Sequence, residues 1–184
     1  MIAELWAEQI IENETTYDKV PPKLKEQVGK ILIDKGYKSL AGLTLDEVKA
    51  QKVAEMNDIQ QETIQNGIDV TLFDGTVEHF TLADHDQTSL MGLKSQVDAG
   101  KEQIPWHTSD EAEHCKFYTN ADMALITAAA MAYVTWHVTY FRDLRIYIRS
   151  LDSKEAVEAV TYGMEIPEVY RSEPLQSMIA EQKS

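Results

Sequence analysis

The stretch NADMALITAAAMAYVTWHVTYFRDLRIYI, residues 120–148, decides the fold because it predicts one long amphipathic helix. Asn120 is a residue type that caps helix N-termini, and Asp122 suits the first turn, where a negative charge interacts favourably with the helix dipole. Apolar side chains then recur at spacings of three and four residues, which places them on one helix face. This face comprises Met123, Ile126, Ala130, Val134, His137, Phe141, Leu144, Ile148 and Leu151. The predicted helix is well above the average length of about 11–12 residues.

Two β-hairpins are predicted before this helix. The first covers residues 68–81, IDVTLF-DG-TVEHFT, in which two β-type runs flank Asp74 and Gly75. This dipeptide favours a type I′ turn, in which both central residues have positive φ. The inward-pointing residues are expected to be Val70, Leu72, Val77 and Phe80. Because the last two have opposite parity, a bulge or an earlier strand end is needed. Residues 104–106 and 115–118 predict the second hairpin.

Three helices are predicted in the first 67 residues. The first carries four apolar residues at helical spacing, which are Ile2, Leu5, Trp6 and Ile10. The second begins near Pro22, since proline suits a first helical turn, and it stops at Gly36. The third begins where Thr44 and Glu47 have capping-box spacing and ends before Gly67. Helices as short as the first two are marginal alone, so they must pack on each other, on the rest of the chain or on a partner.

A further helix, capped by Asp84 or Asp86, is expected between the two hairpins, and the tail beyond Pro174 is expected to be loose. The sequence therefore predicts an α+β, mostly helical fold in which small antiparallel hairpins pack on the long C-terminal helix. The predicted divisions are an N-terminal helical segment over residues 1–42, a connecting helix over 43–67, a compact α+β domain over 68–163 and a polar C-terminal tail over 164–184.

Composition narrows the possible functions. The 184 residues include 17 basic and 31 acidic ones, and the net charge of −14 argues against unspecific binding to nucleic acid or anionic membranes. The single cysteine, Cys115, excludes an internal disulfide framework. The N-terminus has no basic region typical of a signal peptide, and the longest apolar run, residues 123–134, is shorter than the ~20 residues that span a bilayer. We expect a protein of the cytoplasm.

The sequence contains no motif that indicates a catalytic, phosphate-binding or metal-binding site. Glycine-rich phosphate loops, GxSxG, HExxH and paired CxxC motifs are all absent. His107 and His114 with Cys115 lack the spacing of a structural zinc site, and adjacent strand residues point to opposite faces. The acids in Asp84-His85-Asp86 are explained by helix capping. We therefore predict that the protein is not an enzyme and has no catalytic, cofactor-binding or metal site.

Two groups of residues are candidates for a protein interface. Three arginines recur at spacings of three and four in the long helix and suit an acidic partner, although exposed pairs with the chain's own carboxylates are the alternative, worth ~0–1 kcal/mol each. The apolar face of the first helix carries a tryptophan, which must be buried within the chain or against another one. The candidate interface residues are Ile2, Leu5, Trp6, Ile10, Arg142, Arg145 and Arg149.

Two parts of the sequence resemble proteins of tailed bacteriophages. Residues 5–37, LWAEQIIENETTYDKVPPKLKEQVGKILIDKGY, resemble the small XkdX-like proteins encoded beside tail-fibre genes in phages and prophages of Gram-positive bacteria. Residues 68–162 resemble a phage domain of unknown function that often lies at the C-terminus of tail-fibre assembly proteins. The matching features are VTLFDGTVEHF, IPWHT, the long helix and LDSKEAVEAV. The helix between the two parts resembles neither group.

This resemblance implies a non-enzymatic phage tail protein that packs on a tail-fibre or receptor-binding protein. It would act as an assembly factor or chaperone, or as a minor baseplate or tail-fibre component. Self-association is a separate option, because the intermittent apolar stripe of the helix over residues 43–67 also suits a loose coiled coil. Its place would be the cytoplasm of the infected or lysogenic bacterium, or the virion tail. The alternative is a small acidic host-takeover or anti-defence protein that acts by protein–protein binding. The charge is spread along the chain, with −4 over residues 1–67 (8 basic, 12 acidic) and −10 over residues 68–184 (9 basic, 19 acidic), which weakens that alternative.

Overall fold

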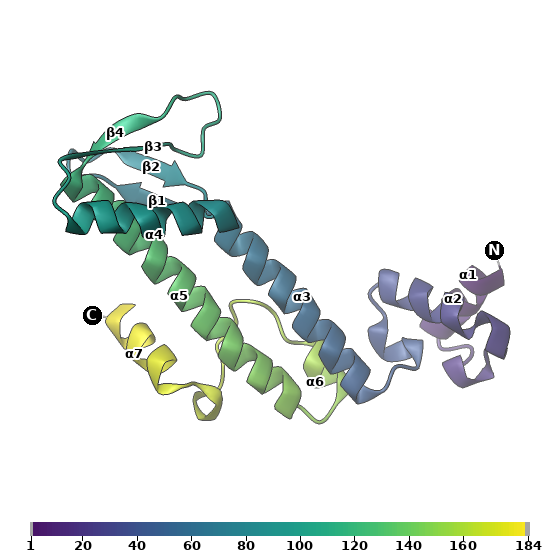
Figure 1. The fold of residues 1–184 in the computed structure, drawn as a ribbon. Coiled ribbons are helices and arrows are strands. Elements are labelled where there is room, and N and C mark those ends of the chain that lie inside the picture. The colour runs from purple at the N-terminus through teal and green to yellow at the C-terminus, as the bar shows by residue number, and fades with distance from the viewer. Residues whose placement is uncertain (1, 183–184) are drawn as a thin grey trace. The chain divides into compact units, whose positions relative to one another are not determined.

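A computed structural model describes residues 2–182, with residues 38 and 39 described by their backbone only. It confirms the predicted α+β, mostly helical fold class, in which two small antiparallel hairpins pack on a long helix (Figure 1). In chain order the helices and strands are α1 (Ile2–Ile11), α2 (Pro22–Asp34), α3 (Leu45–Asn66), β1 (Ile68–Thr71), β2 (Val77–Phe80), α4 (Asp84–Asp98), β3 (Gln103–Trp106), β4 (Lys116–Thr119), α5 (Asn120–Ser150), α6 (Lys154–Glu158) and α7 (Glu173–Gln182).

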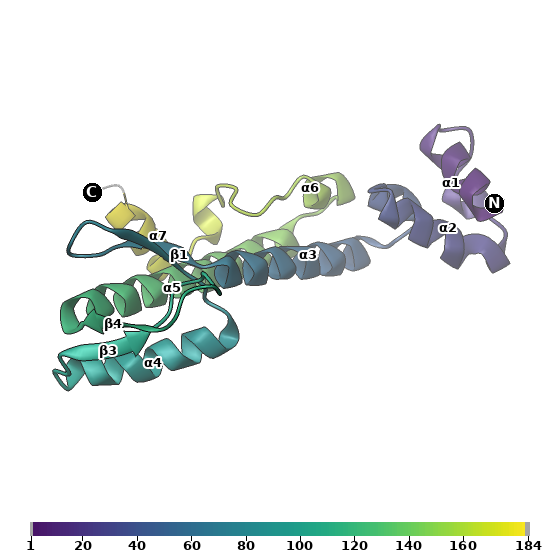
Figure 2. The same cartoon turned by 90° about the horizontal axis from the view of Figure 1, so that it is seen from above.

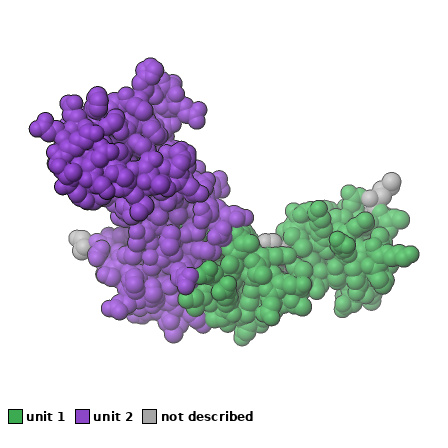
Figure 3. All heavy atoms as spheres, viewed as in Figure 1, with its two compact units in different colours: residues 1–56, 145–166 green, residues 57–144, 167–184 purple. Residues whose placement is uncertain are grey.

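The chain divides into two compact units, each made of two stretches that are distant in sequence (Figure 3). Unit 1 combines residues 1–56 with residues 145–166, and unit 2 combines residues 57–144 with residues 167–184. Helices α3 and α5 contribute residues to both units.

Helices α1 and α2 share a core within unit 1. Its buried side chains are Ala3, Ala7, Ile10, Val20, Val28, Leu32 and Ala41. Tyr17, in the linker between the helices, donates a hydrogen bond of 2.8 Å from its hydroxyl group to the carbonyl oxygen of Lys25. Its ring fits because Gly42 has no side chain: a Cβ there would lie 2.2 Å from the ring. The linker is therefore packed on α2 by an aromatic residue that apolar periodicity does not identify.

The predicted ends of α3 are confirmed. The Thr44 amide donates to Glu47 Oε2 at 2.7 Å, and the Glu47 amide donates to Thr44 Oγ1 at 3.3 Å, which completes a capping box. The helix ends before Gly67, which has a φ of +86°. A Cβ on Gly67 would lie 1.9 Å from the carbonyl oxygen of Phe80, so only glycine fits where α3 meets the first hairpin.

The first hairpin forms as predicted, but its turn does not. Leu72 N donates to Thr76 O at 2.8 Å, and Gly75 N donates to Leu72 O at 3.0 Å, so the loop has three residues. Gly75 has a φ of +87°, whereas Asp74 does not have a positive φ. The predicted type I′ turn is therefore wrong. The hydrogen bonds fit a type I turn followed by a left-handed glycine, the common three-residue hairpin loop.

The extra loop residue changes which side chains of β2 face inward. Val70 pairs with Glu78, and Thr71 pairs with Val77. The sequence predicted that Val77 points inward, but Val77 is exposed. Phe80 is buried, as predicted. The opposite parity of these two residues is resolved because only Phe80 lies on the inner face of the sheet.

The N-termini of α4 and α5 also differ from the predicted caps. α4 is preceded by Ala83, so neither Asp84 nor Asp86 is its cap. At α5, Thr119 Oγ1 accepts a hydrogen bond of 3.1 Å from the Asp122 amide. Asn120, the predicted cap, is the first helical residue, and its side-chain amide donates to the carbonyl oxygens of Val97 and Lys101, both at 3.0 Å. Asn120 thus ties the C-terminus of α4 to the start of α5.

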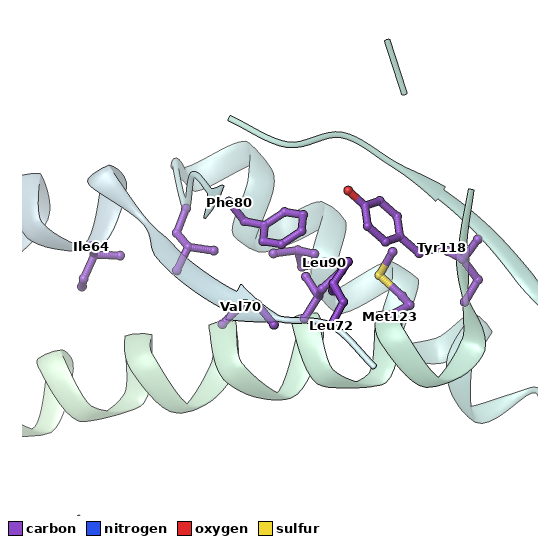
Figure 4. Close-up of a cluster of buried hydrophobic side chains, with 11 residues drawn as sticks. Ile64, Val70, Leu72, Phe80, Leu90, Tyr118 and Met123 are labelled. Carbon is purple, nitrogen blue, oxygen red and sulfur yellow. The ribbon is translucent and has the colours of Figure 1, made fainter. Parts of the chain in front are cut away.

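The core of unit 2 lies between the hairpins, α4 and α5. Figure 4 shows Val70 of β1 and Leu72, the residue after β1, above α5, with Phe80, Leu90 and Tyr118 near them. Figure 2 shows β3 alongside α4. The buried set is Ile64, Val70, Leu72, Phe80, Leu82, Leu90, Ile104, Tyr118, Met123, Ile126 and Ala130. Met123, Ile126 and Ala130 of the stripe predicted for the long helix are part of this core, and Val134 packs against it.

The C-terminal tail is not loose beyond Pro174, contrary to prediction. It forms α7, whose Leu175 is buried. The Ser172 amide and hydroxyl group donate to Asp143 Oδ2 of α5 at 2.7 and 2.8 Å. Leu175, the half-buried Met178 and Ile179, and the hydrogen bonds to Asp143 thus attach a segment whose composition is mostly polar.

Candidate protein-interaction site

The exposed apolar residues of α1 are the first candidate surface. Ile2 and Leu5 both belong to the predicted interface face, and they are 65% and 60% exposed. Ile10 is buried at 3% exposure and Trp6 is half-buried against the core of α1 and α2. Ile10 is therefore used within the chain, and the surface left for a partner consists of Ile2 and Leu5. We call these two residues the α1 pair.

Charged residues lie beside Leu5 of the α1 pair. A hollow of about 410 Å³ beside Leu5 is lined also by Glu4, Glu8 and Lys35. The Lys35 ammonium group lies 3.6 Å from Glu8 Oε1, and both side chains are about half exposed. This arrangement, an apolar centre with a charged edge, is typical of protein interfaces.

The three predicted arginines do not form one surface within a unit. Arg142 is exposed and belongs to unit 2, whereas Arg145 and Arg149 belong to unit 1. Arg145 is half-buried and engaged in interactions within the chain. The carbonyl oxygen of Arg149 accepts a hydrogen bond of 2.9 Å from Lys49. Arg142 and Arg149 are thus the more exposed of the three candidates.

A second surface, on the outer side of α5 in unit 2, was not predicted from the sequence. We define the outer face of α5 as the exposed residues Leu125, Ala128, Met131, Ala132, Thr135 and Val138. The most exposed of its large apolar side chains are those of Met131 and Val138, at 43% and 52%. Residues 123–141 contain no Asp, Glu, Lys or Arg. A helix that buries one apolar stripe usually carries charged residues on its opposite face. The absence of charge on every face over residues 123–141 is the signal in the sequence that points to this surface.

The outer face of α5 continues into a groove of about 940 Å³ beside α7. Ile68, Met131, Trp136 and Met178 supply much of its apolar lining. The Trp136 ring stacks on Tyr140 at a centroid distance of 5.1 Å, and its buried indole N–H has no hydrogen-bond acceptor among the described residues. An acceptor brought by a bound molecule would satisfy this group.

His137, which also lines the groove, is buried. The Gln60 amide donates to its carbonyl oxygen at 3.3 Å, and Tyr133 packs edge-on against its ring at 4.4 Å. Burial lowers the pKa of His137, which favours the neutral imidazole. The predicted role of His137 as a residue of the inner helix face is confirmed.

By length and composition, α5 is also the one described helix that is apolar enough to cross a membrane. One third of the relevant 18-residue window is buried within the protein. Core helices of soluble proteins meet the same criterion, so this property does not distinguish an intramolecular core or a protein interface from a membrane span.

Asp86 and two histidines form a cluster at the start of α4. The Asp86 carboxyl group is 2% exposed and accepts a hydrogen bond of 3.0 Å from the Thr81 hydroxyl group. The Nε2 atoms of His85 and His107 lie 3.2 and 3.9 Å from Asp86 Oδ1. Within residues 2–182, no three His, Cys, Asp or Glu side chains are grouped so that they would hold a metal ion. Asp86 Oδ1 has no hydrogen-bond donor among the described residues, so the Thr81 hydroxyl group holds this carboxyl group through its other oxygen.

A family model described as a domain of unknown function, DUF4376, matches residues 47–162. The match includes most of α3, both hairpins, α4, α5 and α6. No curated protein matches the chain. No solved structure matches it either. Because the matched region is more than half of the 184 residues, the chain belongs to the DUF4376 family.

Proposed function

We propose that the chain is a non-enzymatic tail protein of a tailed bacteriophage that packs on a tail-fibre or receptor-binding protein. It acts either as an assembly factor or as a minor component of the baseplate or tail fibre. The phage context rests on the sequence resemblance of residues 5–37 and 68–162. The observation that supports a docking role is the exposure of Ile2 and Leu5 next to a core that is complete without them.

The α1 pair has no structural role that explains its apolar character. The side chains that hold α1 to α2 are those of Ala3, Ala7 and Ile10, on the opposite side of the helix. Burying a large aliphatic side chain contributes roughly 1.5–3 kcal/mol, so a partner that covers both residues gains a central part of its binding free energy from them, and the rest comes from the surrounding contacts. The acids Glu4 and Glu8 beside Leu5 favour a partner with basic residues around an apolar hollow.

The test is co-expression with the product of the neighbouring tail-fibre gene, followed by size-exclusion chromatography with light scattering. The variant Leu5→Glu places a charge at the centre of the α1 pair, while Gln27→Glu adds the same charge at an exposed position of α2. We expect a stable complex with the wild-type chain and with Gln27→Glu, and loss of the complex with Leu5→Glu. A complex that survives Leu5→Glu would show that docking does not use this surface.

Mass spectrometry of purified phage particles then separates the two versions of the proposal. A chain that persists in particles is a structural tail component, whereas one that forms the complex and is absent from particles is an assembly factor. If the wild-type chain forms no complex at all, the tail-protein proposal is wrong and the anti-defence alternative takes precedence.

A further inference from the structure

The outer face of α5 is uncharged over a long distance in a strongly acidic protein. The 19 residues from Met123 to Phe141 include no Asp, Glu, Lys or Arg, although charged residues make up 26% of the chain. Along a helix these residues extend about 28 Å, at 1.5 Å per residue. Leu125, Met131 and Val138 are exposed along this length. Exposed apolar surface arranged in a continuous stripe marks a protein contact more often than single exposed residues do.

The arrangement of side chains on this face is symmetric about Met131 and Ala132. Ala128 lies three residues before Met131, and Thr135 lies three residues after Ala132. Leu125 and Val138 lie six residues before Met131 and six after Ala132, respectively. In two antiparallel helices, residues at equal distances from the centre face each other. The pattern therefore matches itself, as the isologous interface of a twofold dimer requires.

The outer face of α5 carries no charged side chain, so no pair of like charges opposes the contact of two copies. With a net charge of −14 per chain, two copies repel in general, so their contact requires an uncharged surface.

We propose that two copies of this chain associate through the outer faces of α5, antiparallel, with the twofold axis near Met131 and Ala132. Ala128, Ala132 and Thr135 are small and allow the two helices to approach closely, and Leu125 of one copy packs against Val138 of the other. Met178, which lines the groove beside this face, adds apolar surface at its edge. The proposed dimer uses unit 2, whereas the α1 pair belongs to unit 1, so each proposal can fail without the other.

The experiment is sedimentation velocity on the full chain over about a hundredfold range of concentration, since mass action reveals weak self-association. The variant Ala132→Glu places two like charges near the twofold axis. Met91→Glu, at a position of α4 that is 60% exposed, is the matched control. We expect the wild-type chain and Met91→Glu to dimerise alike, and the dissociation constant of Ala132→Glu to rise at least about tenfold. Unchanged circular dichroism would show that Ala132→Glu still folds.

Disulfide trapping tests the direction of pairing. In a Cys115→Ser background, a chain with Ala128→Cys mixed with a chain with Thr135→Cys should give a mixed disulfide under mild oxidation. Cross-linking of Ala128→Cys with itself in preference to the mixed pair would indicate a parallel arrangement and would overturn the proposal. A wild-type chain that stays monomeric at every concentration would overturn it too, as would a monomer that inserts this face into neutral phosphatidylcholine vesicles.

Discussion

Tyr118 of β4 donates a hydrogen bond of 2.7 Å from its hydroxyl group to Glu78 Oε2 of β2, and this bond joins two hairpins that belong to separate sheets. The Lys116 ammonium group donates a hydrogen bond to the other carboxylate oxygen, Glu78 Oε1. The carboxylate therefore accepts hydrogen bonds from both a phenol and an ammonium group. Burial, and then the neighbouring Glu78, raise the pKa of Tyr118 far above its usual value, which keeps the phenol a hydrogen-bond donor. The two hairpins are thus held together by polar as well as apolar contacts.

Removal of this hydroxyl group should destabilise unit 2. We expect Tyr118→Phe to lower the free energy of unfolding by about 1–3 kcal/mol, because the nearly buried Glu78 carboxylate loses a donor. Tyr133→Phe is the control, since the Tyr133 hydroxyl group makes only a longer bond of 3.3 Å to the Thr63 carbonyl oxygen. Urea denaturation monitored by circular dichroism measures both. Equal losses for the two variants would contradict a special role for the Tyr118–Glu78 bond.

Gly67 should tolerate no side chain. Its φ of +86° and the closeness of the Phe80 carbonyl oxygen predict that Gly67→Ala costs more than about 2 kcal/mol of stability. Gly75→Ala provides the comparison, because Gly75 has nearly the same φ but nothing lies within 4 Å of its added Cβ. We expect it to cost about 1 kcal/mol, the backbone penalty alone. Thermal unfolding of both variants separates the steric effect from the backbone effect.

These two glycines also show where sequence reasoning succeeds and where it stops. Both mark breaks in apolar patterns, so the ends of α3 and the position of the first hairpin are predictable from local information. The turn type was not, because Asp-Gly fits both a two-residue and a three-residue loop. The choice between them moved Val77 outward, since each residue added to a loop reverses the facing of the strand that follows.

The candidate site shows the same division. The sequence indicates that the face of Ile2, Leu5, Trp6 and Ile10 is apolar, but which of these residues the chain itself buries depends on α2 and on the linker residue Tyr17. The outer face of α5 was missed because a search for one periodic stripe accounts for the inner residues and ignores the rest. α7 was missed because its ordering depends on Asp143, thirty residues upstream of Glu173.

The stability of the first hairpin should depend on pH through His79. Hydrogen bonds from its ring to the Asp69 carboxylate and to the Asn66 carbonyl oxygen raise the pKa of His79 above 6.5. A raised folded pKa stabilises the protein below the unfolded pKa, and this contribution is lost as pH rises through the folded pKa. We therefore expect Asp69→Asn to lower the urea midpoint more at pH values below about 6 than at values above about 8.

Burial of His137 changes the stability with pH in the opposite direction. Its lowered pKa means that the unfolded chain takes up a proton which the folded chain does not, so this contribution destabilises the protein as pH falls below 6.5. The difference between wild type and Asp69→Asn at each pH cancels the His137 contribution and isolates that of His79. A difference that is the same at all pH values would show that the Asp69 contact does not depend on the charge of His79.

The attachment of α7 should depend on Asp143 more than the rest of unit 2 does. Asp143 is 3% exposed and its Oδ2 atom accepts hydrogen bonds from both the amide and the hydroxyl group of Ser172, at the residue before α7. Replacement by alanine removes both bonds, each worth about 1.5–3 kcal/mol when the acceptor is charged. The helix then keeps the contacts of Leu175 and of the half-buried Met178 and Ile179, so we expect Asp143→Ala to open α7 locally before the core unfolds. Hydrogen exchange should accelerate across residues 173–182 by at least about tenfold, while amides of β1 and β2 keep their protection.

The control is Ser172→Ala, which removes the hydroxyl donor and keeps the amide, so its effect on the exchange of α7 should be smaller. If Asp143→Ala accelerated exchange in the two hairpins as much as in α7, Asp143 would instead support the whole of unit 2.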